Sequence, residues 1–189
     1  MKSSHAAVRS AAHPRAGQVM TGAEIIVQVL VDEGVDVIFG YSGGAILPTY
    51  DAVFRHNAQE TAASHGHPMP LIVPANEQGA AFMAAGYARA SGKVGVCIVT
   101  SGPGATNTVT PVRDCAADSV PIVVICGQVP TAAIGTDAFQ EAPVSNAVYP
   151  QQQRRPDRPV LIEICPACSL KRIGFYPSYK GRTRQHRRA

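Results

Sequence analysis

No stretch of this sequence is apolar over the roughly 20 residues that a membrane-spanning helix requires. Charge is also scarce, because only 16% of the 189 residues are Asp, Glu, Lys or Arg, whereas 46% are hydrophobic. The lack of a spanning segment predicts a soluble protein with no membrane partner. The hydrophobic content is sufficient for one well-buried core, and a chain of this length is not expected to hold a second full domain.

The sequence also lacks the cysteine pattern of a secreted, disulfide-rich protein. Its cysteines are odd in number and suit a reducing cytosol, so we predict a cytoplasmic location. Cys165 and Cys168 have the spacing of a metal or redox pair, but no second Cys or His pair completes a zinc site, and no helix follows to activate a thiol. We therefore predict no metal site. The five cysteines are Cys97, Cys115, Cys126, Cys165 and Cys168.

Positive charge gathers at the two ends of the chain, and residues 1–20 contain no acidic side chain. The formal net charge is +4. A basic tail is a weak sign of nucleic-acid binding, but the interleaved aromatic residues and motifs of such proteins are absent, so we expect no nucleic-acid partner. Residues 1–20 resemble an organelle transit peptide in composition. A disordered leader is the interpretation that we favour for them.

The first part of the chain carries the signals of a helix, a buried strand and a second helix. Thr21 and Glu24 have the spacing of a capping box, and the apolar residues that follow recur on one face, which predicts a helix up to Gly34. Residues 36–40 predict a short buried strand. A second helix is expected to start near Leu47.

Residues 55–70 form a polar stretch with two prolines, which predicts an exposed loop. Three histidines lie in this stretch and could bind a metal ion. Loop residues without a metal are the interpretation that we prefer for them. They are His56, His65 and His67.

Strands and helices then alternate in the order that is typical of a parallel sheet. Residues 71–73, 94–99 and 121–126 are apolar without alternation, as strands covered on both faces should be. Residues 77–90 predict a helix packed closely on the sheet, and a turn at 101–107 leads into another helix. The order predicts a single doubly wound α/β domain with helices on both faces, whose ligands bind at the carboxyl ends of the strands.

The pattern weakens after Asn146. A linker-like stretch precedes one more expected strand at 160–164, and the remainder is basic and irregular. We therefore expect a leader over 1–20, the domain over 21–148, and a degenerate C-terminal segment over 149–189.

The glycine-rich turn Ser101-Gly-Pro-Gly104 is, by itself, only a tight connection between a strand and a helix. It matches neither the dinucleotide fingerprint nor the phosphate-binding loop that ends in Gly-Lys-Ser/Thr. Composition and spacing alone indicate an α/β domain and no particular chemistry.

Several motifs taken together, in order, are more specific. Over about Met20 to Asn146 they resemble the large subunit of the acetolactate synthase family, whose enzymes depend on thiamine diphosphate. The Gly135 to Glu141 string is the most specific to that family. The motifs are Phe39-Gly-Tyr-Ser-Gly-Gly-Ala-Ile-Leu-Pro48, Asn76-Glu-Gln-Gly-Ala80, Gly86-Tyr-Ala-Arg89, Thr100-Ser-Gly-Pro-Gly-Ala-Thr-Asn107, Gly127-Gln-Val-Pro130 and Gly135-Thr-Asp-Ala-Phe-Gln-Glu141.

The resemblance implies that Glu77 is catalytic, exchanging a proton with the pyrimidine ring of the cofactor so that the thiazolium can be activated. Burial of this carboxylate would raise its proton affinity, and its position at a helix start would lower it. For a lone Glu at such a position, simple capping is the alternative.

The resemblance also implies roles for residues in the other motifs. Gly44 and Gln140 are expected at the catalytic centre, and Phe139 beside them would face the substrate. Six residues in addition to Glu77 are expected to bind the cofactor, and part of this set would also shape a dimer interface. They are Tyr41, Gly43, Ser101, Gly102, Pro103 and Asn107.

The sequence departs from the family pattern at two positions near these motifs, where Asn76 replaces a usual His and Ser42 a usual Pro. Family members also bind magnesium and FAD, but the motifs for both are absent, so we expect a truncated chain with only the pyrimidine half of the cofactor site. The family reaction decarboxylates pyruvate and condenses it to 2-acetolactate for branched-chain amino-acid synthesis. Alternatives are another thiamine-diphosphate decarboxylase or oxidase, or a non-catalytic interaction module. An oligomer is expected in either case.

Overall fold

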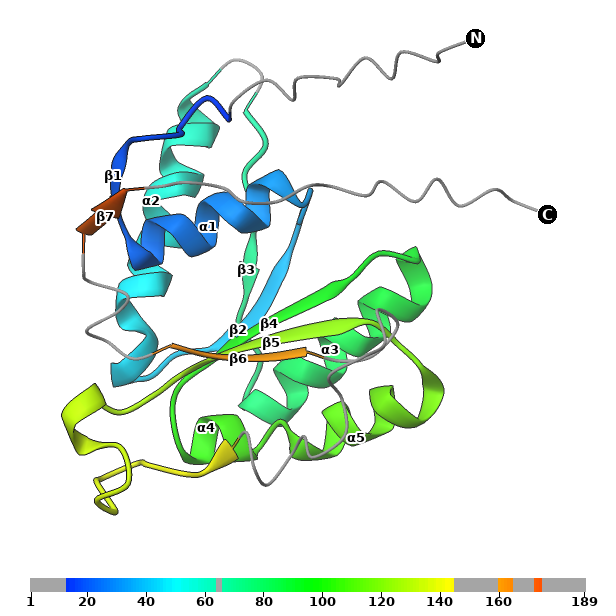
Figure 1. The fold of residues 1–189 in the computed structure, drawn as a ribbon. Helices are drawn as coiled ribbons and strands as arrows, with labels where there is room; N and C mark the ends of the chain where they lie inside the picture. The colour runs from blue at the N-terminus through cyan, green and yellow to red at the C-terminus, as the bar shows by residue number, and fades with distance from the viewer. Residues whose placement is uncertain (1–12, 64–65, 145–159, 165–171, 175–189) are drawn as a thin grey trace, which may run out of the picture.

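A computed structural model describes residues 13–63, 66–144, 160–164 and 172–174 of the chain (Figure 1). Most of the expected leader, the pair Cys165 and Cys168, and the basic tail from residue 175 lie outside these ranges. The predictions made for them therefore stay predictions.

The central feature is a sheet of five parallel strands in the order β3-β2-β4-β5-β6. Phe39 of β2 lies between Ile72 of β3 and Cys97 of β4, and Cys97 in turn pairs with Val124 of β5. This parallel register confirms the predicted sheet, including its last strand. The strands are β2 (Ile38–Tyr41), β3 (Leu71–Ile72), β4 (Gly95–Val99), β5 (Ile122–Gly127) and β6 (Val160–Ile164).

Helices cover both faces of this sheet, as predicted. Figure 1 shows α1 and α2 on one side of the strands and α3, α4 and α5 on the other. The bounds are α1 (Gly22–Asp32), α2 (Leu47–Ala62), α3 (Glu77–Ser91), α4 (Pro103–Thr106) and α5 (Val109–Asp118).

The side chains of β4 show why both faces need cover. Val96 and Ile98 belong to the core under α1 and α2, whereas Cys97 and Val99 belong to the core under α3 and α5. All four are fully buried, so each face of the strand removes apolar surface from water. Helix α3 packs closely on its face of the sheet through small side chains, namely Ala80, Ala81, Ala84, Ala85 and Ala88.

Side-chain caps fix the starts of two helices. Thr21 and Glu24 form the predicted capping box of α1, since each side chain accepts a hydrogen bond from the other's backbone N–H. The side chain of Asn76 caps α3 by accepting a 2.7 Å hydrogen bond from the N–H of Gly79. The side chain of Asn76 therefore has a structural role, because its hydrogen bond fixes the start of α3.

The prediction of an exposed loop from Arg55 is wrong over its first part, because α2 continues to Ala62. Five of the eight residues from Arg55 to Ala62 are good helix formers (Arg, Ala, Gln, Glu and Ala), and Asp51 and Arg55 form an i,i+4 ion pair of 3.1 Å. The Asn57 side chain then holds the returning chain through two hydrogen bonds to the backbone of Met69.

Two short strands lie where we expected irregular ends. Strand β1 (Val19–Thr21) pairs antiparallel with β7 (Arg172–Gly174), and Met20 is buried. The last residues of the expected leader and part of the C-terminal segment thus belong to regular structure. Because this pairing joins the first and the last strand that the structure describes, Val19 opposite Gly174, no local pattern predicted it.

The loops at the carboxyl ends of β2 and β4 diverge to opposite faces of the sheet. The loop after β2 passes through a 3-10 helix, η1 (Gly44–Ile46), into α2 on one face, and the turn after β4 enters α4 and α5 on the other. Such a divergence between adjacent parallel strands opens a crevice in which α/β proteins bind ligands. Most of the predicted site residues follow these strands.

Candidate functional site

Glu77 lies at this edge of the sheet as the first residue of α3. Its side chain is partly buried, and its Oε2 accepts a 3.0 Å hydrogen bond from the side-chain amide of Asn107, which follows α4. Two of the predicted residues, 30 positions apart in the sequence, are thereby brought into direct contact. A carboxylate held by one donor, with part of its surface open, can still accept or release a proton from a ligand.

The backbone at Gly43 and at Gly104 lies very close to the side chain of Thr100, and Gly104 also lies close to Glu77. A Cβ atom placed on Gly43 would lie 2.5 Å from Cβ of Thr100, and one placed on Gly104 would lie 2.6 Å from its Cγ2 and 3.5 Å from Oε1 of Glu77. The Oγ1 of Thr100 is buried without a hydrogen-bond partner. A buried hydroxyl without a hydrogen-bond partner is costly, and such groups are uncommon in folded proteins.

The turn between β4 and α4 makes a second close contact. Gly102 has a φ of +53°, and a Cβ placed on it would lie 2.3 Å from the carbonyl oxygen of Gln140. Glycine is required here for both reasons, because other residues rarely adopt this φ and none has room for a side chain. The contact brings Gln140 to the turn that carries Ser101, whose side chain is buried.

The segment after β5 forms an exposed loop over residues 131–141, beginning with a 3-10 helix, η2 (Thr131–Ala133). Phe139 is 88% exposed, which is unusual for a large apolar side chain. The carboxylate of Glu141 accepts hydrogen bonds from the N–H groups of Gly135 and Ala138. These backbone donors hold the pKa of the Glu141 carboxyl below its usual value.

Not every predicted residue joins the cluster around Glu77. Tyr41 ends β2 with its side chain partly exposed, and Pro103 is exposed at the start of α4. Gly44 lies in open space, because a Cβ atom placed on it would meet no atom within 4 Å. No hydrogen bond joins Tyr41 to Glu77 within the described part of the chain.

Two buried groups lie beneath the site. Burial raises the pKa of the Tyr50 hydroxyl and of the Cys97 thiol, and the negative charge of Glu77 adds to both shifts. Tyr50 donates a 3.0 Å hydrogen bond to the carbonyl oxygen of Ile98 in β4. Both groups therefore stay protonated at neutral pH, so the protein interior next to Glu77 carries no charge from them.

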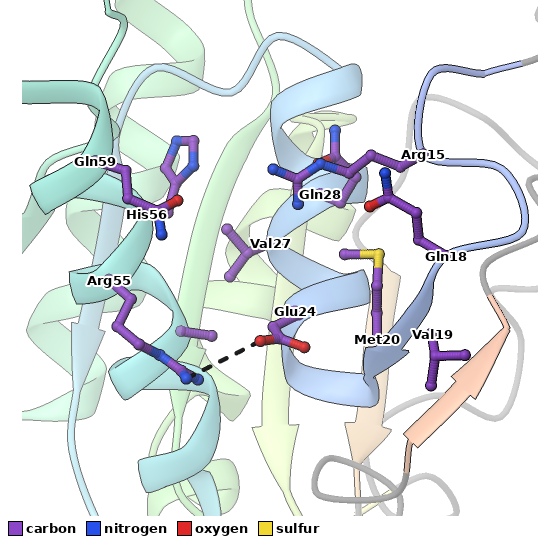
Figure 2. A pocket seen from close by; sticks show the side chains of 11 residues that line it. Arg15, Gln18, Val19, Met20, Glu24, Val27, Gln28, Arg55, His56 and Gln59 are labelled. Atoms are coloured by element: carbon purple, nitrogen blue, oxygen red, sulfur yellow. Dashed lines mark ion pairs between the residues drawn. The ribbon is translucent and has the colours of Figure 1, made fainter. Parts of the chain in front are cut away.

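A separate cavity of about 410 Å³ lies between α1, α2 and the segment before β1. Figure 2 shows Arg15 on one side and His56 on the other, with Arg55 near Glu24. None of the predicted site residues lines this cavity. Arg55 is also paired with Asp51, and Glu24 takes part in the capping box, so the cavity concentrates no charge of one sign.

Within the residues that the structure describes, no group of three or more His, Cys, Asp or Glu side chains is placed to hold a metal ion. The same residues include no helix long and apolar enough to cross a membrane.

Comparison with known families decides the family of the chain. Residues 20–148 match the model of the thiamine pyrophosphate enzyme N-terminal TPP binding domain. The chain belongs to the thiamine pyrophosphate enzyme family. The match confirms the resemblance inferred from the motifs, and it covers every residue of the candidate site.

The relatives of this thiamine pyrophosphate enzyme domain include acetolactate synthases. The chain is 56% identical over 125 residues to the mitochondrial acetolactate synthase catalytic subunit of Saccharomyces cerevisiae, covering 66% of the chain and 17% of that protein. It is 50% identical over 125 residues to the isozyme 2 large subunit of Escherichia coli, covering 66% and 21%, and 46% identical over 145 residues to the large subunit of Corynebacterium glutamicum, covering 77% and 22%. The match thus spans about a fifth of each relative.

Two residues of this thiamine pyrophosphate enzyme domain were not assigned a role from the sequence. Thr100 was part of a motif, but only its burial against Gly43 shows its unpaired hydroxyl. Glu141 ended another motif, and an acid six residues after a glycine could have suggested a loop closed by a carboxylate. Nothing in the sequence showed which N–H groups it would meet.

Proposed function

We propose that this chain supplies the pyrimidine half of a thiamine-diphosphate site in an acetolactate synthase-like protein. The observation that carries the proposal is the hydrogen bond between Asn107 and Glu77 at the switch point of the sheet. It holds a partly exposed carboxylate next to backbone that lacks side chains at Gly43 and Gly104.

The donors and acceptors at this edge fit a flat, nitrogen-containing ring. Glu77 offers a carboxylate that can exchange a proton with a ring nitrogen, while Asn107 orients it. The absence of side chains at Gly43 and Gly104 lets Thr100 pack closely at this edge of the sheet. When bound, thiamine diphosphate supplies an electron sink for the decarboxylation of a 2-oxo acid such as pyruvate.

The other predicted residues extend this arrangement. Gln140 and Phe139, on the exposed loop beside Gly102, would face a substrate. Tyr41, Ser101 and Pro103 would line the cofactor site from the ends of β2 and β4. Gly44, which has open space around it, would let the cofactor or substrate approach the backbone.

We propose that 2-acetolactate formation, on the route to branched-chain amino acids, is the reaction of the complete protein. The first relatives are about five to six times as long as the matched part, and the diphosphate, magnesium and FAD would need residues outside the motifs found here. A homo- or hetero-oligomer would supply them. A cytoplasmic location and a domain over 21–148 also remain proposals.

The competing function is a non-catalytic interaction module that keeps this fold. The exposed loop with Phe139 is the feature that favours it, because a large apolar side chain in water suits a contact surface. The two functions differ in whether Glu77 matters for ligand binding.

Calorimetric titration with thiamine diphosphate and magnesium, beside a pyruvate turnover assay, tests the proposal. We expect weak binding, loss of that binding in Glu77→Gln, and no turnover by the chain alone. Glu33→Gln is the matched control, because it makes the same charge change at an exposed position that ends α1. Equal binding by the chain and Glu77→Gln would favour the interaction module, and turnover by the chain alone would contradict the half-site.

A further inference from the structure

We infer that Glu141 is a positioning residue, whose carboxylate holds the loop 131–141 so that Gln140 lies against the turn at Gly102. This inference rests on the proposed function only where it assigns the loop 131–141 a place at the cofactor site. The hydrogen bonds and backbone angles that carry it are properties of the chain itself.

The carboxylate of Glu141 lies in a nest of backbone N–H groups. Gly135 donates to Oε1, and Ala138 donates to Oε2 at 3.1 Å, so each carboxylate oxygen has its own donor. The backbone of Thr136 and Asp137, between these donors, also stabilises the charged form. Successive N–H groups that converge in a turn commonly bind an anion, and here the anion is a side chain of the same loop.

The loop needs such a support because its backbone is strained. Asp137 has a φ of +57° and Gln140 a φ of +60°, and both are residues with side chains in the left-handed region. Asp tolerates this region, but Gln has no short polar group that would favour it. A strained residue persists only where surrounding contacts hold it, and strain of this kind concentrates at functional sites.

Little apolar packing holds the loop between its two ends. Val129 and Val144 are buried and anchor the flanking chain, whereas Phe139 and Gln140 are exposed. The conformation of residues 135–141 is therefore set by polar contacts, and the hydrogen bonds to Glu141 connect the two ends of this segment. Gln140 in turn meets Gly102, which continues into the turn that holds Gly104 beside Glu77.

This chain of contacts gives Glu141 a specific consequence for the site. Without the Glu141 carboxylate, the backbone of Gln140 can relax to an ordinary conformation. The carbonyl oxygen of Gln140 then moves away from Gly102. Phe139, the neighbouring residue, would be reoriented at the same time. The residue thus acts through Gln140 and Phe139, not by touching a ligand.

Nuclear magnetic resonance of the full chain tests this inference without any cofactor. In Glu141→Gln, which keeps the shape but removes the charge, we expect hydrogen exchange at the Gly135 and Ala138 amides to accelerate by on the order of tenfold, matching the loss of a charged acceptor. The nuclear Overhauser contact between the α-protons of Gly102 and Gln140 should weaken. Asp137→Asn is the matched control, since it changes the same charge in the same loop.

A pH titration adds a readout that a merely packed side chain would not give. The amide shifts of Gly135 and Ala138 should follow one protonation with a midpoint below the ordinary glutamate value of 4.5, since backbone donors lower the pKa of Glu141. Asp137 and Glu77 are the other acids at this edge of the sheet. The Asp137→Asn control shows whether a titration seen at these amides comes from Asp137, which lies in the same loop. Unchanged exchange and an unchanged Gly102 to Gln140 contact in Glu141→Gln would overturn the inference.

Failure here and failure of the proposed function are distinguishable. The proposed function fails if thiamine diphosphate binding does not depend on Glu77, whatever the loop does. The inference fails if the loop keeps its conformation without the Glu141 carboxylate, whatever the cofactor does.

Discussion

The side-chain amide of Asn107 donates a 3.0 Å hydrogen bond to Oε2 of Glu77, linking the end of α4 to the start of α3. Because Asn107 is exposed and Glu77 is only partly buried, Asn107→Ala should lower the free energy of unfolding by no more than about 1 kcal/mol. Thiamine diphosphate affinity should fall several-fold, since the carboxylate loses its orientation. Urea denaturation and calorimetric titration measure the two effects. A larger loss of stability than of affinity would mean that the contact is structural.

The close approach of Gly43 to Thr100 predicts a contrast with the next residue. Gly43→Ala should cost about 1 to 3 kcal/mol of stability, because its Cβ would overlap the Thr100 side chain at 2.5 Å. Gly44→Ala should be close to neutral, because no atom lies within 4 Å of the added methyl group. Equilibrium unfolding of the two variants in urea gives the comparison. Equal stability of both would show that the loop after β2 is not packed as described.

The cap at the start of α3 is measurable in the same way. Asn76→Ala should destabilise the chain by about 1 kcal/mol, because the N–H of Gly79 loses its acceptor. Asn76→Asp, which also caps well, should retain most of the stability. An Asn76→Ala variant as stable as Asn76→Asp would exclude this hydrogen bond as the reason for Asn at this position.

Alkaline pH should destabilise the fold through the buried groups beneath the site. Cys97 and Tyr50 have pKa values raised by burial above their ordinary values of 9.0 and 10.0, so the unfolded chain loses these protons first. Their contribution is complete below pH 9 and is lost as the pH rises, at up to about 1.4 kcal/mol per pH unit for each group. Unfolding curves between pH 8 and 11, compared with those of Cys97→Ala and Tyr50→Phe, test this. Variants with the same slope as the parent chain would contradict it.

Much of the fold was predictable because the relevant signals are local. Strands such as 94–99 are apolar on both faces, and Thr21 with Glu24 forms a complete cap within four residues. The end of α2 was mispredicted because the prolines at 68 and 70 indicate a loop, whereas the helix formers before Ala62 extend the helix. The pairing of β1 with β7 depends on contacts between distant parts of the chain, which no local pattern contains.

For the candidate site, the sequence motifs supplied candidate residues but not the contacts between them. The motifs placed Glu77 and Asn107 in the site, yet their hydrogen bond exists only because β3 and β4 flank β2 and end at one edge. The contact of Gln140 with Gly102 depends on two backbone angles that the residue types do not dictate. The role of Glu141 depends on which N–H groups meet its carboxylate, and the sequence does not show those contacts.

The most direct test of the account is to map, by amide chemical shifts, where thiamine binds on the isotope-labelled chain. Thiamine lacks the diphosphate, so it reports the pyrimidine half alone. We predict shifts at Gly43, Gly104 and Asn107 that disappear in Glu77→Gln and persist in Glu33→Gln. Shifts confined to the cavity between α1 and α2, or shifts that Glu77→Gln leaves intact, would contradict the assignment of this edge of the sheet as the pyrimidine half-site.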